Sequence, residues 1–396
     1  MNRAEKMTNT EITLTENDFK KLDPQHTSSE ESGVPPMTYW QDVGRRFRSN
    51  IPAMISAAAI LLLVLVAVIG PHLSEHSYED QQLSYANIPP VMDLYKIGES
   101  KWLYMHRNLR LIETSRSGEL LGTIPMQKED LFKKKMIYDI DGRKIIIDYG
   151  RKPFVLTDGD GNVLKPAKKA GPDGYLLGTD ALGRDLFIRT LYGARISMLV
   201  ALIATLANFL IGVVYGGISG LAGGKIDNLM MRIVDIISTI PLTLYVILIM
   251  VVLDSGFLSI IIALGSVYWV NMARIVRGQI LALKEQEFVL AARTIGTSTP
   301  RILFQHLLPN SMGVIIVTAT MLIPSAIFIE SFLSFIGLGV SAPMASWGTL
   351  CSEALDAIRT FPYQLFTPAL AICVTMFAFN FLGDGLRDAL DPKLRK

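Results

Sequence analysis

The stretch FVLTDGDGNVL carries alternating oxygen-bearing side chains of the kind found in calcium-binding loops, namely Asp158, Asp160 and Asn162. Calcium takes about six to eight oxygen ligands, and a loop that presents a carboxylate or an amide at every second position can supply several of them. The downstream acidic residue that usually completes such a loop is missing. We therefore interpret the stretch as a simple turn and predict no metal site.

Nucleotide-binding and catalytic patterns are also incomplete. The segment SGLAGGK, residues 219–225, ends in a lysine as a phosphate-binding loop does, but Ser219 replaces the first glycine and Ile226 follows the lysine. No strand-forming run precedes the segment, so a phosphate cradle is not expected there. The motifs of zinc peptidases and serine hydrolases do not occur, and the five histidines have no convincing ligand spacing. We predict no catalytic residues and no cofactor, and hence not an enzyme.

Two carboxylates fall inside apolar stretches, where a charge is costly and often functional. Asp235 follows Arg232 by three residues, so the two side chains can pair on one helix face. Glu330 stands beside Ser331 and has no obvious basic partner. Structural packing is the favoured interpretation of Glu330, and a role in a translocation path is the alternative. Asn271 is a second candidate for that path.

Hydrophobic residues make up 50% of the chain and are gathered into runs, which indicates an integral membrane protein. A net charge of +2 gives no reason to expect nucleic-acid binding. About twenty apolar residues are enough to cross a bilayer as a helix. Six stretches qualify, and their interiors are rich in small residues that favour close helix packing: 51–70, 196–221, 229–253, 256–275, 311–335 and 363–383.

The distribution of lysine and arginine sets the expected orientation of these spans. Basic residues gather before the first span, between the fourth and fifth, and after the sixth, and such segments stay in the cytoplasm. Both termini are then cytoplasmic, with a tail at 1–50 that includes an interfacial helix at 38–50, and a second tail at 384–396. The five spans within 196–383 form a core that contains a cytoplasmic loop at 276–310.

Residues 71–195 form the only sizeable region outside the predicted spans, and the same orientation places them on the extracytoplasmic side. The stretch MIYDIDGRKIIIDYG has two β-rich runs around Asp141 and Gly142, which is a strong hairpin signal. Similar runs predict a small β-rich region at 93–172. The expected fold is an all-α polytopic membrane protein that carries this β-rich extracytoplasmic insertion.

A small polar loop, EFVLAARTIGTSTPRILFQHLLPN, interrupts the spans at residues 287–310. We expect a short helix at 284–295 with Gly296 as its left-handed cap. Ala291 and Ala292 would present a small-residue face that another protein can approach closely.

A second short helix is expected after the glycine. Thr299 can cap it, and Pro300 suits its first position. Pro309 ends that helix or begins the next span. From the residues alone, a docking helix and an ordinary helical loop are both possible.

The loop resembles the EAA loop of bacterial ABC importer permeases, E-A-A-x-x-x-G followed by I-x-L-P. Leu290 stands where the family often has glutamate and His306 where it often has isoleucine, while a carboxylate lies nearby at Glu287. The chain matches the motif, with the correct spacing, at Ala291, Ala292, Gly296, Leu308 and Pro309.

Further segments narrow the resemblance to oligopeptide and dipeptide permeases of the C type. LLGTDALGRDLFIRTLYGARIS at 176–197 is similar to the segment before their second span, and FNFLGDGLRDALDPKLRK at 379–396 is similar to their C-terminus. The β-rich residues 93–173 depart from this pattern and look like an insertion.

The resemblance implies a type I ABC importer permease fold in a bacterial inner or plasma membrane. It implies one half of a translocation path for oligopeptides or dipeptides, with the loop residues acting as an ATPase-coupling helix. The implied partners are a second homologous permease subunit, two ATPase subunits that hydrolyse ATP, an extracytoplasmic peptide-binding protein, the peptide substrate and membrane lipid. The alternatives are the same machine carrying a nickel chelate or an antimicrobial peptide, an ion-driven carrier, and a membrane sensor with a ligand-binding outer domain.

Overall fold

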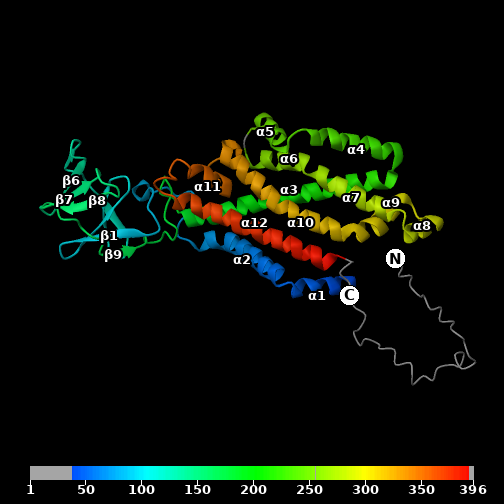
Figure 1. Cartoon of the computed structure of the whole chain (residues 1–396), viewed down its shortest axis with the longest axis horizontal. Helices are drawn as coiled ribbons and strands as arrows, with labels where there is room; N and C mark the ends of the chain where they lie inside the picture. Colours follow the sequence, from blue (N-terminus) through cyan, green and yellow to red (C-terminus); the bar gives the residue numbers. More distant parts are fainter. Residues whose placement is uncertain (1–37, 255, 392–396) are drawn as a thin grey trace, which may run out of the picture. The chain divides into compact units, whose positions relative to one another are not determined.

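The computed structural model describes residues 38–391 apart from residue 255, so the outer parts of both predicted tails lie outside the described residues. Within the described residues, five helical segments are long and apolar enough to cross a membrane (Figure 1). They are α2 (Ile51–Leu73), α3 (Leu186–Ala222), α6 with α7 (Phe257–Val267 and Trp269–Leu283), the segment Thr299–Leu338, and α12 (Tyr363–Leu390). The segment Thr299–Leu338 consists of α9 (Thr299–Ile302), the π-helical η3 (Leu303–Leu307), α10 (Leu308–Leu333) and the π-helical η4 (Ser334–Leu338).

The expected third span, 229–253, is a bent pair of helices rather than one straight helix. α4 covers Gly224–Thr239 and α5 covers Leu242–Leu253, with a bend of 84° between them. Pro241 lies at the bend, where it cannot donate the backbone hydrogen bond that would continue α4. The described chain therefore has five candidate spans, or six if the bent pair crosses as one.

Two helices extend beyond the predicted spans. α3 begins at Leu186 rather than 196, because Asp185 caps its first turn and accepts hydrogen bonds from the backbone N–H groups of Phe187 (2.8 Å) and Ile188 (3.3 Å). α12 continues through Leu390, so much of the predicted tail at 384–396 is helix. Hydropathy locates the apolar middle of such a helix and misses its polar ends.

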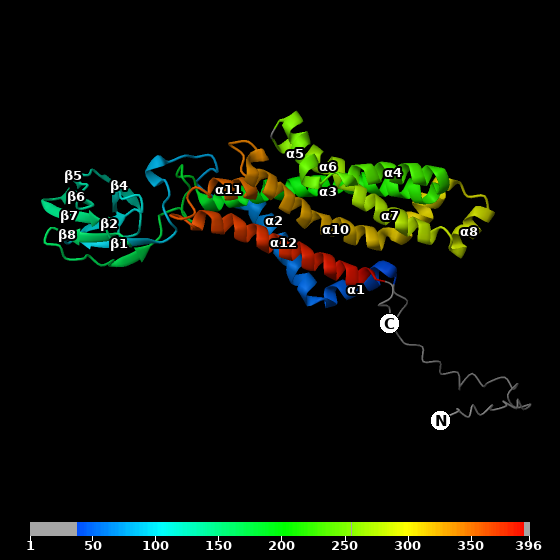
Figure 2. The same cartoon turned by 45° about the horizontal axis from the view of Figure 1, so that its top comes forward.

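α3 is central to the bundle and contacts α2, α6, α7, α10 and α12 (Figures 1 and 2). Its glycines at 212, 216 and 220 recur every four residues and face α7. A Cβ atom on Gly216 would lie 2.3 Å from the carbonyl oxygen of Ala273, and one on Gly212 would lie 2.6 Å from the Cβ of Met272. Glycine at these positions allows the two helix backbones to approach closely, as small residues do in membrane helix pairs.

A proline inside α2 explains a polar contact between α2 and α3. Pro71 has no N–H, so the carbonyl oxygen of Ala67 loses its helical donor. Arg195 of α3 replaces that donor, since its Nε donates to Ala67 O at 2.5 Å and its Nη2 donates to Val68 O at 2.6 Å. Such replacement is needed because water is scarce in a bilayer core.

Nine strands are described between α2 and α3, in agreement with the predicted β-rich region at 93–172. They form two antiparallel sheets of order β4-β3-β2-β1-β9 and β5-β6-β7-β8 (Figure 2). The strands are β1 (Met92–Ile97), β2 (Lys101–Met105), β3 (Leu111–Thr114), β4 (Leu120–Ile124), β5 (Lys128–Asp130), β6 (Lys135–Ile140), β7 (Arg143–Asp148), β8 (Val155–Asp158) and β9 (Lys168–Ala170). Residues from both sheets share one apolar cluster, which includes Leu103, Leu111, Ile147 and Leu156.

The two turns predicted in this region are confirmed. β6 and β7 are joined by Asp141 (φ 51°) and Gly142 (φ 78°), the left-handed pair that a two-residue hairpin favours. In the candidate calcium stretch, Asp158 Oδ1 accepts hydrogen bonds from the backbone N–H groups of Asp160 (3.0 Å) and Asn162 (2.8 Å). A bond from the Asn162 side chain, at 3.0 Å, lowers the pKa of the Asp158 carboxyl, and these backbone bonds lower it further. The Asp158 carboxylate therefore stabilises the turn by accepting hydrogen bonds from its backbone.

The remaining elements are short. α1 (Tyr39–Ser49) confirms a helix within 38–50, and its Tyr39 and Trp40 are exposed. η2 (Leu83–Tyr85) is a 3₁₀ turn before β1. α11 (Trp347–Glu353) starts with a capping box between Ser346 and Thr349. The loop between α7 and α9 contains α8 (Glu287–Thr294).

Candidate functional site

The loop helix α8 is present, although shorter than the predicted 284–295. α7 ends at Leu283, and the backbone N–H of Gln286 donates to the Leu283 carbonyl at 3.1 Å, which closes a turn between the two helices. Gln286 then occupies the N-cap position and Glu287 is the first residue of α8. A negative charge in a first helical turn is favourable, because the unpaired N–H groups there carry partial positive charge.

Gly296 ends α8 as predicted. Its φ is +82°, a conformation that suits glycine. The N–H of Gly296 donates to the Arg293 carbonyl at 2.9 Å, and the N–H of Thr297 donates to the Ala292 carbonyl at 3.0 Å. This pair of bonds is the Schellman motif, which satisfies carbonyl groups that the helix end would leave unpaired.

The two alanines do not form one exposed face. Ala291 is exposed, whereas Ala292 is 6% exposed and packs in the core of the chain with Val289. Neighbouring residues on an α-helix point about 100° apart, because one turn takes 3.6 residues. The expectation that Ala292 faces a partner is therefore corrected. The exposed side of α8 carries larger apolar groups, Phe288 and Leu290, with Ile295 just beyond it.

The second short helix follows the prediction with a shift of one residue. Ser298, not Thr299, is the N-cap of α9, and Pro300 lies in its first turn. The Ser298 carbonyl accepts the first helical bond, from the N–H of Ile302 at 3.0 Å. Pro309 is the second residue of α10, which directly follows the π-helical η3, so it lies within the continuous helical segment Thr299–Leu338 and does not end the second short helix.

α8 is attached to the bundle by apolar packing. Val289 and Ala292 belong to a buried cluster with Val276 and Ile280 of α7 and with Leu303 of η3. Val213 of α3 and Ile315 of α10 complete the connection to two other helices, and Leu308 is also buried there. Close packing transmits displacement, so a force on α8 reaches α3, α7 and α10 together.

An ion pair between Arg277 and Asp227 lies beside this cluster, where α3 ends and α4 begins. Arg277 of α7 donates to both oxygens of Asp227, Nε at 2.5 Å and Nη2 at 2.6 Å, while Ser219 Oγ donates to the same carboxylate. Lys284 Nζ donates to the Gly220 carbonyl at 3.2 Å. Bidentate arginine–carboxylate pairs fix geometry strongly. This ion pair could not be predicted from the sequence, because no local spacing links residue 227 to residue 277.

The pairing predicted for Asp235 is wrong. Its partner is Arg274 of α7, whose Nη2 lies 2.9 Å from Asp235 Oδ1 and 2.6 Å from Ser238 Oγ, and not Arg232. α4 packs against α7, so the facing helix supplies the cation. Both members of the pair are exposed, and an ion pair of that kind contributes little stability.

Of the two path candidates, Glu330 is fully buried and fits the packing interpretation. Its carboxylate accepts hydrogen bonds from Ser197 of α3 and from Ser334 of η4, both at 2.8 Å. Ser197 also accepts a hydrogen bond from the backbone N–H of Trp347 at 3.2 Å. The cluster therefore joins α3, α10 and α11. Asn271 of α7 is exposed and is not part of it.

A second charged cluster lies at the start of α3. Arg189 is 1% exposed, and its Nη1 lies 2.6 Å from Asp180 and 2.6 Å from Glu353 of α11. Arg184 contacts the same two carboxylates at 2.6 and 2.8 Å. Three of these residues come from the segment 176–197, which the resemblance singled out, whereas Glu353 of α11 lies 164 residues beyond Arg189. The structure brings them together.

Comparison with known proteins now assigns the family. Residues 212–396 match the family model of the binding-protein-dependent transport system inner membrane component, and residues 38–90 match the N-terminal TM domain of oligopeptide transport permease C. The oligopeptide transport system permease protein OppC of Bacillus subtilis is 40% identical over 383 residues, 97% of this chain and 99% of that protein. The chain belongs to the oligopeptide and dipeptide permease family.

Other relatives agree with this membership. The dipeptide transport system permease protein DppC of Bacillus subtilis is 41% identical over 363 residues, 91% of this chain and 88% of that protein. Membership makes the chain an inner membrane component of an ABC transporter, and it decides against the ion-driven carrier and the membrane sensor. The solved methionine ABC transporter MetNI, in inward-facing form, is 17% identical with a TM-score of 0.45 over 52% of this chain and 98% of its own, too low to carry an argument.

The β-rich region matches a difference in length between relatives. The OppC protein of Haemophilus influenzae is 46% identical over 244 residues, which are 61% of this chain and 78% of that protein. That relative is therefore about 310 residues long (244/0.78), against 396 here. The difference is close to the length of the predicted insertion at 93–172.

Proposed function

We propose that this permease forms half of the membrane path of an ATP-driven importer of oligopeptides or dipeptides, together with a second, homologous permease subunit. The substrate class is that named for its relatives, the oligopeptide permease OppC and the dipeptide permease DppC. ATP is hydrolysed by two separate ATPase subunits, and an extracytoplasmic binding protein delivers the peptide. A nickel chelate or an antimicrobial peptide is the alternative cargo of the same machine.

The observation that carries the coupling part of this proposal is that one side of α8 is buried and the other is exposed. Val289 and Ala292 hold the helix on the bundle, while Phe288 (40% exposed) and Leu290 (47% exposed) point away from it. Exposed apolar side chains that gather on a helix outside the candidate spans are typical of a docking surface. α8 therefore receives force from an ATPase subunit through these side chains. Glu287, Ala291 and Gly296 line or shape the same surface, and Leu308 and Pro309 join it to α10.

The orientation is part of the same proposal. With six spans, the bent pair α4–α5 crosses once, both termini and α8 lie in the cytoplasm, and the β-rich region lies outside. Basic residues on the segment that carries α8 support this arrangement, including Arg293 and Arg301. Asn271 is exposed on α7 and remains our candidate for the path, whereas Glu330 acts by packing.

The test compares two matched variants that place an arginine on an exposed leucine. Leu290→Arg changes the exposed face of α8, and Leu355→Arg, on a residue 39% exposed between α11 and α12, is the control. Wild type and the control should co-purify with ATPase subunits in detergent and support uptake of labelled tetra-alanine. Leu290→Arg should lose both while it is inserted in the membrane at normal level. Retention of ATPase and uptake by Leu290→Arg would refute the docking role of α8.

A further inference from the structure

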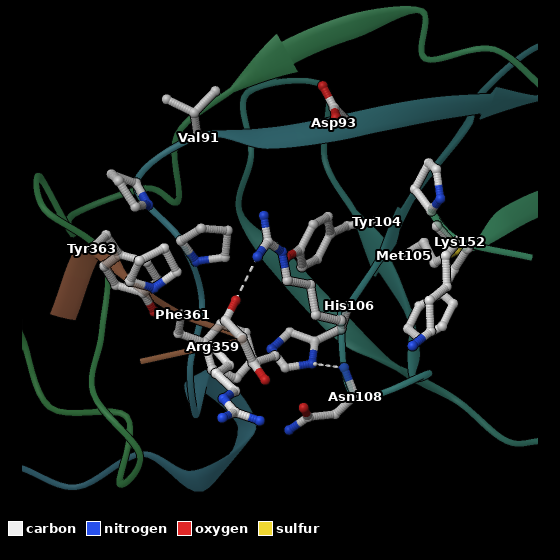
Figure 3. Close-up of a pocket in the computed structure, with 17 residues that line it drawn as sticks. Val91, Asp93, Tyr104, Met105, His106, Asn108, Lys152, Arg359, Phe361 and Tyr363 are labelled. Atoms are coloured by element: carbon white, nitrogen blue, oxygen red, sulfur yellow. Dashed lines mark hydrogen bonds between the residues drawn. The ribbon is translucent and has the colours of Figure 1, made fainter. Parts of the chain in front are cut away.

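A groove of about 940 Å³ lies where the β-rich region meets the segment between α11 and α12 (Figure 3). Tyr104 and His106 of the β-rich region contribute to it from one direction, and Phe361 and Tyr363 from the other. The start of α12 is joined to the segment before β1, because the Tyr363 hydroxyl donates to the Ile88 carbonyl at 3.0 Å. The groove is therefore preformed, which lowers the entropy cost of binding a ligand there.

The charge of the groove is positive. Three exposed cations line it, Arg107, Lys152 and Arg359, against the single carboxylate of Asp93. Arg107 is held in place, since its Nη1 donates to the carbonyl of Thr360 at 2.5 Å. This bond places Arg107 against the backbone of the residue that follows Arg359 in the chain.

Two of these cations have no anionic partner of their own. Lys152 and Arg359 form no ion pair with any residue of the described part of the chain. Figure 3 shows them on different sides of the groove. Unpaired cations around a concavity attract an anionic ligand, and an arginine can bind a carboxylate through two parallel hydrogen bonds.

Much of the rest of the lining is apolar or proline, although Asn108 and Thr360 are polar. Prolines stand at four lining positions, and they contribute no backbone donors: Pro89, Pro90, Pro153 and Pro362. Phe154 and Val91 add apolar surface. A volume near 940 Å³ is within the range of about 300–1,000 Å³ that is usual for small-ligand sites. The lining thus suits a short ligand with an apolar body and a negative end.

We propose that this groove is a peptide-binding site on the permease itself, in which Arg359, beside Arg107, binds the C-terminal carboxylate of a short peptide. Lys152 adds positive potential on the other side, and the aromatic and proline residues contact the peptide body. The inference rests on the proposed import of peptides, because that function brings short peptides to the outer face. The chain's own tails cannot fill the groove, since the proposed orientation places both in the cytoplasm.

A whole protein is a weaker candidate for the occupant. A stable protein interface buries about 800 Å² on each partner, and it needs an extended surface rather than a single groove. A loop of the binding protein is the remaining competitor, and the experiment separates it from free peptide.

The experiment measures binding of tetra-alanine, and of its C-terminal amide, to the full permease complex in lipid nanodiscs without binding protein. The amide lacks only the negative charge, so the acid should bind about tenfold more tightly. Arg359→Gln should weaken binding of the acid about tenfold and leave the amide unchanged. Lys133→Gln, which removes an exposed cation of the β-rich region outside the groove, is the matched control and should have no effect.

Three results would overturn the proposal: no binding of the acid at millimolar concentration, equal binding of acid and amide, or full binding by Arg359→Gln. If peptide does not bind but Arg359→Gln weakens the affinity of the complex for its binding protein, the groove belongs to that partner instead. Peptide uptake by cells that contain wild-type permease and binding protein is measured in parallel. Uptake without binding in the groove refutes only this inference, whereas no uptake of any peptide refutes the proposed function.

Discussion

The two ends of α10 are held in different ways. At Leu308 the helix joins η3 and α8 through buried aliphatic side chains such as Leu303 and Leu307. At Leu333 it joins η4 and α11 through a buried carboxylate with serine donors, next to the Arg189 cluster. Hydrogen bonds and ion pairs demand fixed directions, whereas apolar contacts tolerate sliding. We therefore expect the α11 end of α10 to keep its geometry, and we call it the fixed joint. We expect α8 and the α8 end of α10 to shift together, and we call this end the movable joint.

The largest expected effect breaks the fixed joint. Arg189→Met removes the deeper of the two arginines that contact Asp180 and Glu353, while Arg184 stays, and should destabilise the permease by about 3 kcal/mol. We expect a lower midpoint in thermal unfolding in detergent, or loss of folded protein from the membrane. Arg116→Met, at an exposed β-turn position, is the control and should match wild type. An unchanged midpoint in Arg189→Met would show that this end is not held by its charges.

A smaller effect is expected where α3 meets α7. Gly216→Ala adds a Cβ that would lie 2.3 Å from the Ala273 carbonyl oxygen, so the helices must separate, at a cost of about 1–3 kcal/mol. Gly278→Ala is the matched control in α7, because nothing lies within 4 Å of an added Cβ there. The thermal unfolding midpoint of Gly216→Ala should be lower than that of Gly278→Ala. Equal midpoints would argue that the α3–α7 contact yields easily.

The end of α8 gives a sharper probe of the movable joint. Gly296→Ala forces a Cβ into a left-handed conformation with open space around it, so the cost is backbone strain of about 1 kcal/mol. We expect near-normal stability and a measurable fall in peptide uptake, because the helix end loses its fixed direction. Gly296→Asn, which tolerates this conformation better, should restore part of the uptake. If both variants transport equally badly, the conformation of residue 296 is not what matters.

The smallest effect concerns pH at the β-rich region. Burial lowers the pKa of His106, whose Nε2 lies 3.0 Å from the Asn87 carbonyl oxygen. The unfolded chain then takes up a proton more readily than the folded one, so stability is full above about pH 6.5 and falls as the pH drops below it. His106→Gln should flatten the fall of the unfolding midpoint between pH 7.5 and 5.5. A slope equal to that of wild type would contradict the assignment to His106.

Much of the fold could be predicted from single residues. Apolar runs located the spans, Asp141 and Gly142 located the hairpin, and Gly296 located the end of α8. Each of these depends on local physics, namely the transfer of a side chain to lipid or the conformations that one backbone position allows. Family motifs added the function, since Ala291, Gly296 and Pro309 stand at the expected spacing.

What the sequence could not determine depends on contacts between distant residues. The bidentate pair of Asp227 and Arg277, the burial of Ala292 and the partner of Asp235 follow from how α4, α7 and α8 pack, and no local pattern contains that information. The groove at Arg359 likewise exists only where two segments more than two hundred residues apart meet. The sequence thus determined which segments form helices and turns, because those preferences are local. Only the tertiary structure decided which side chains share a site, because that depends on packing across the whole bundle.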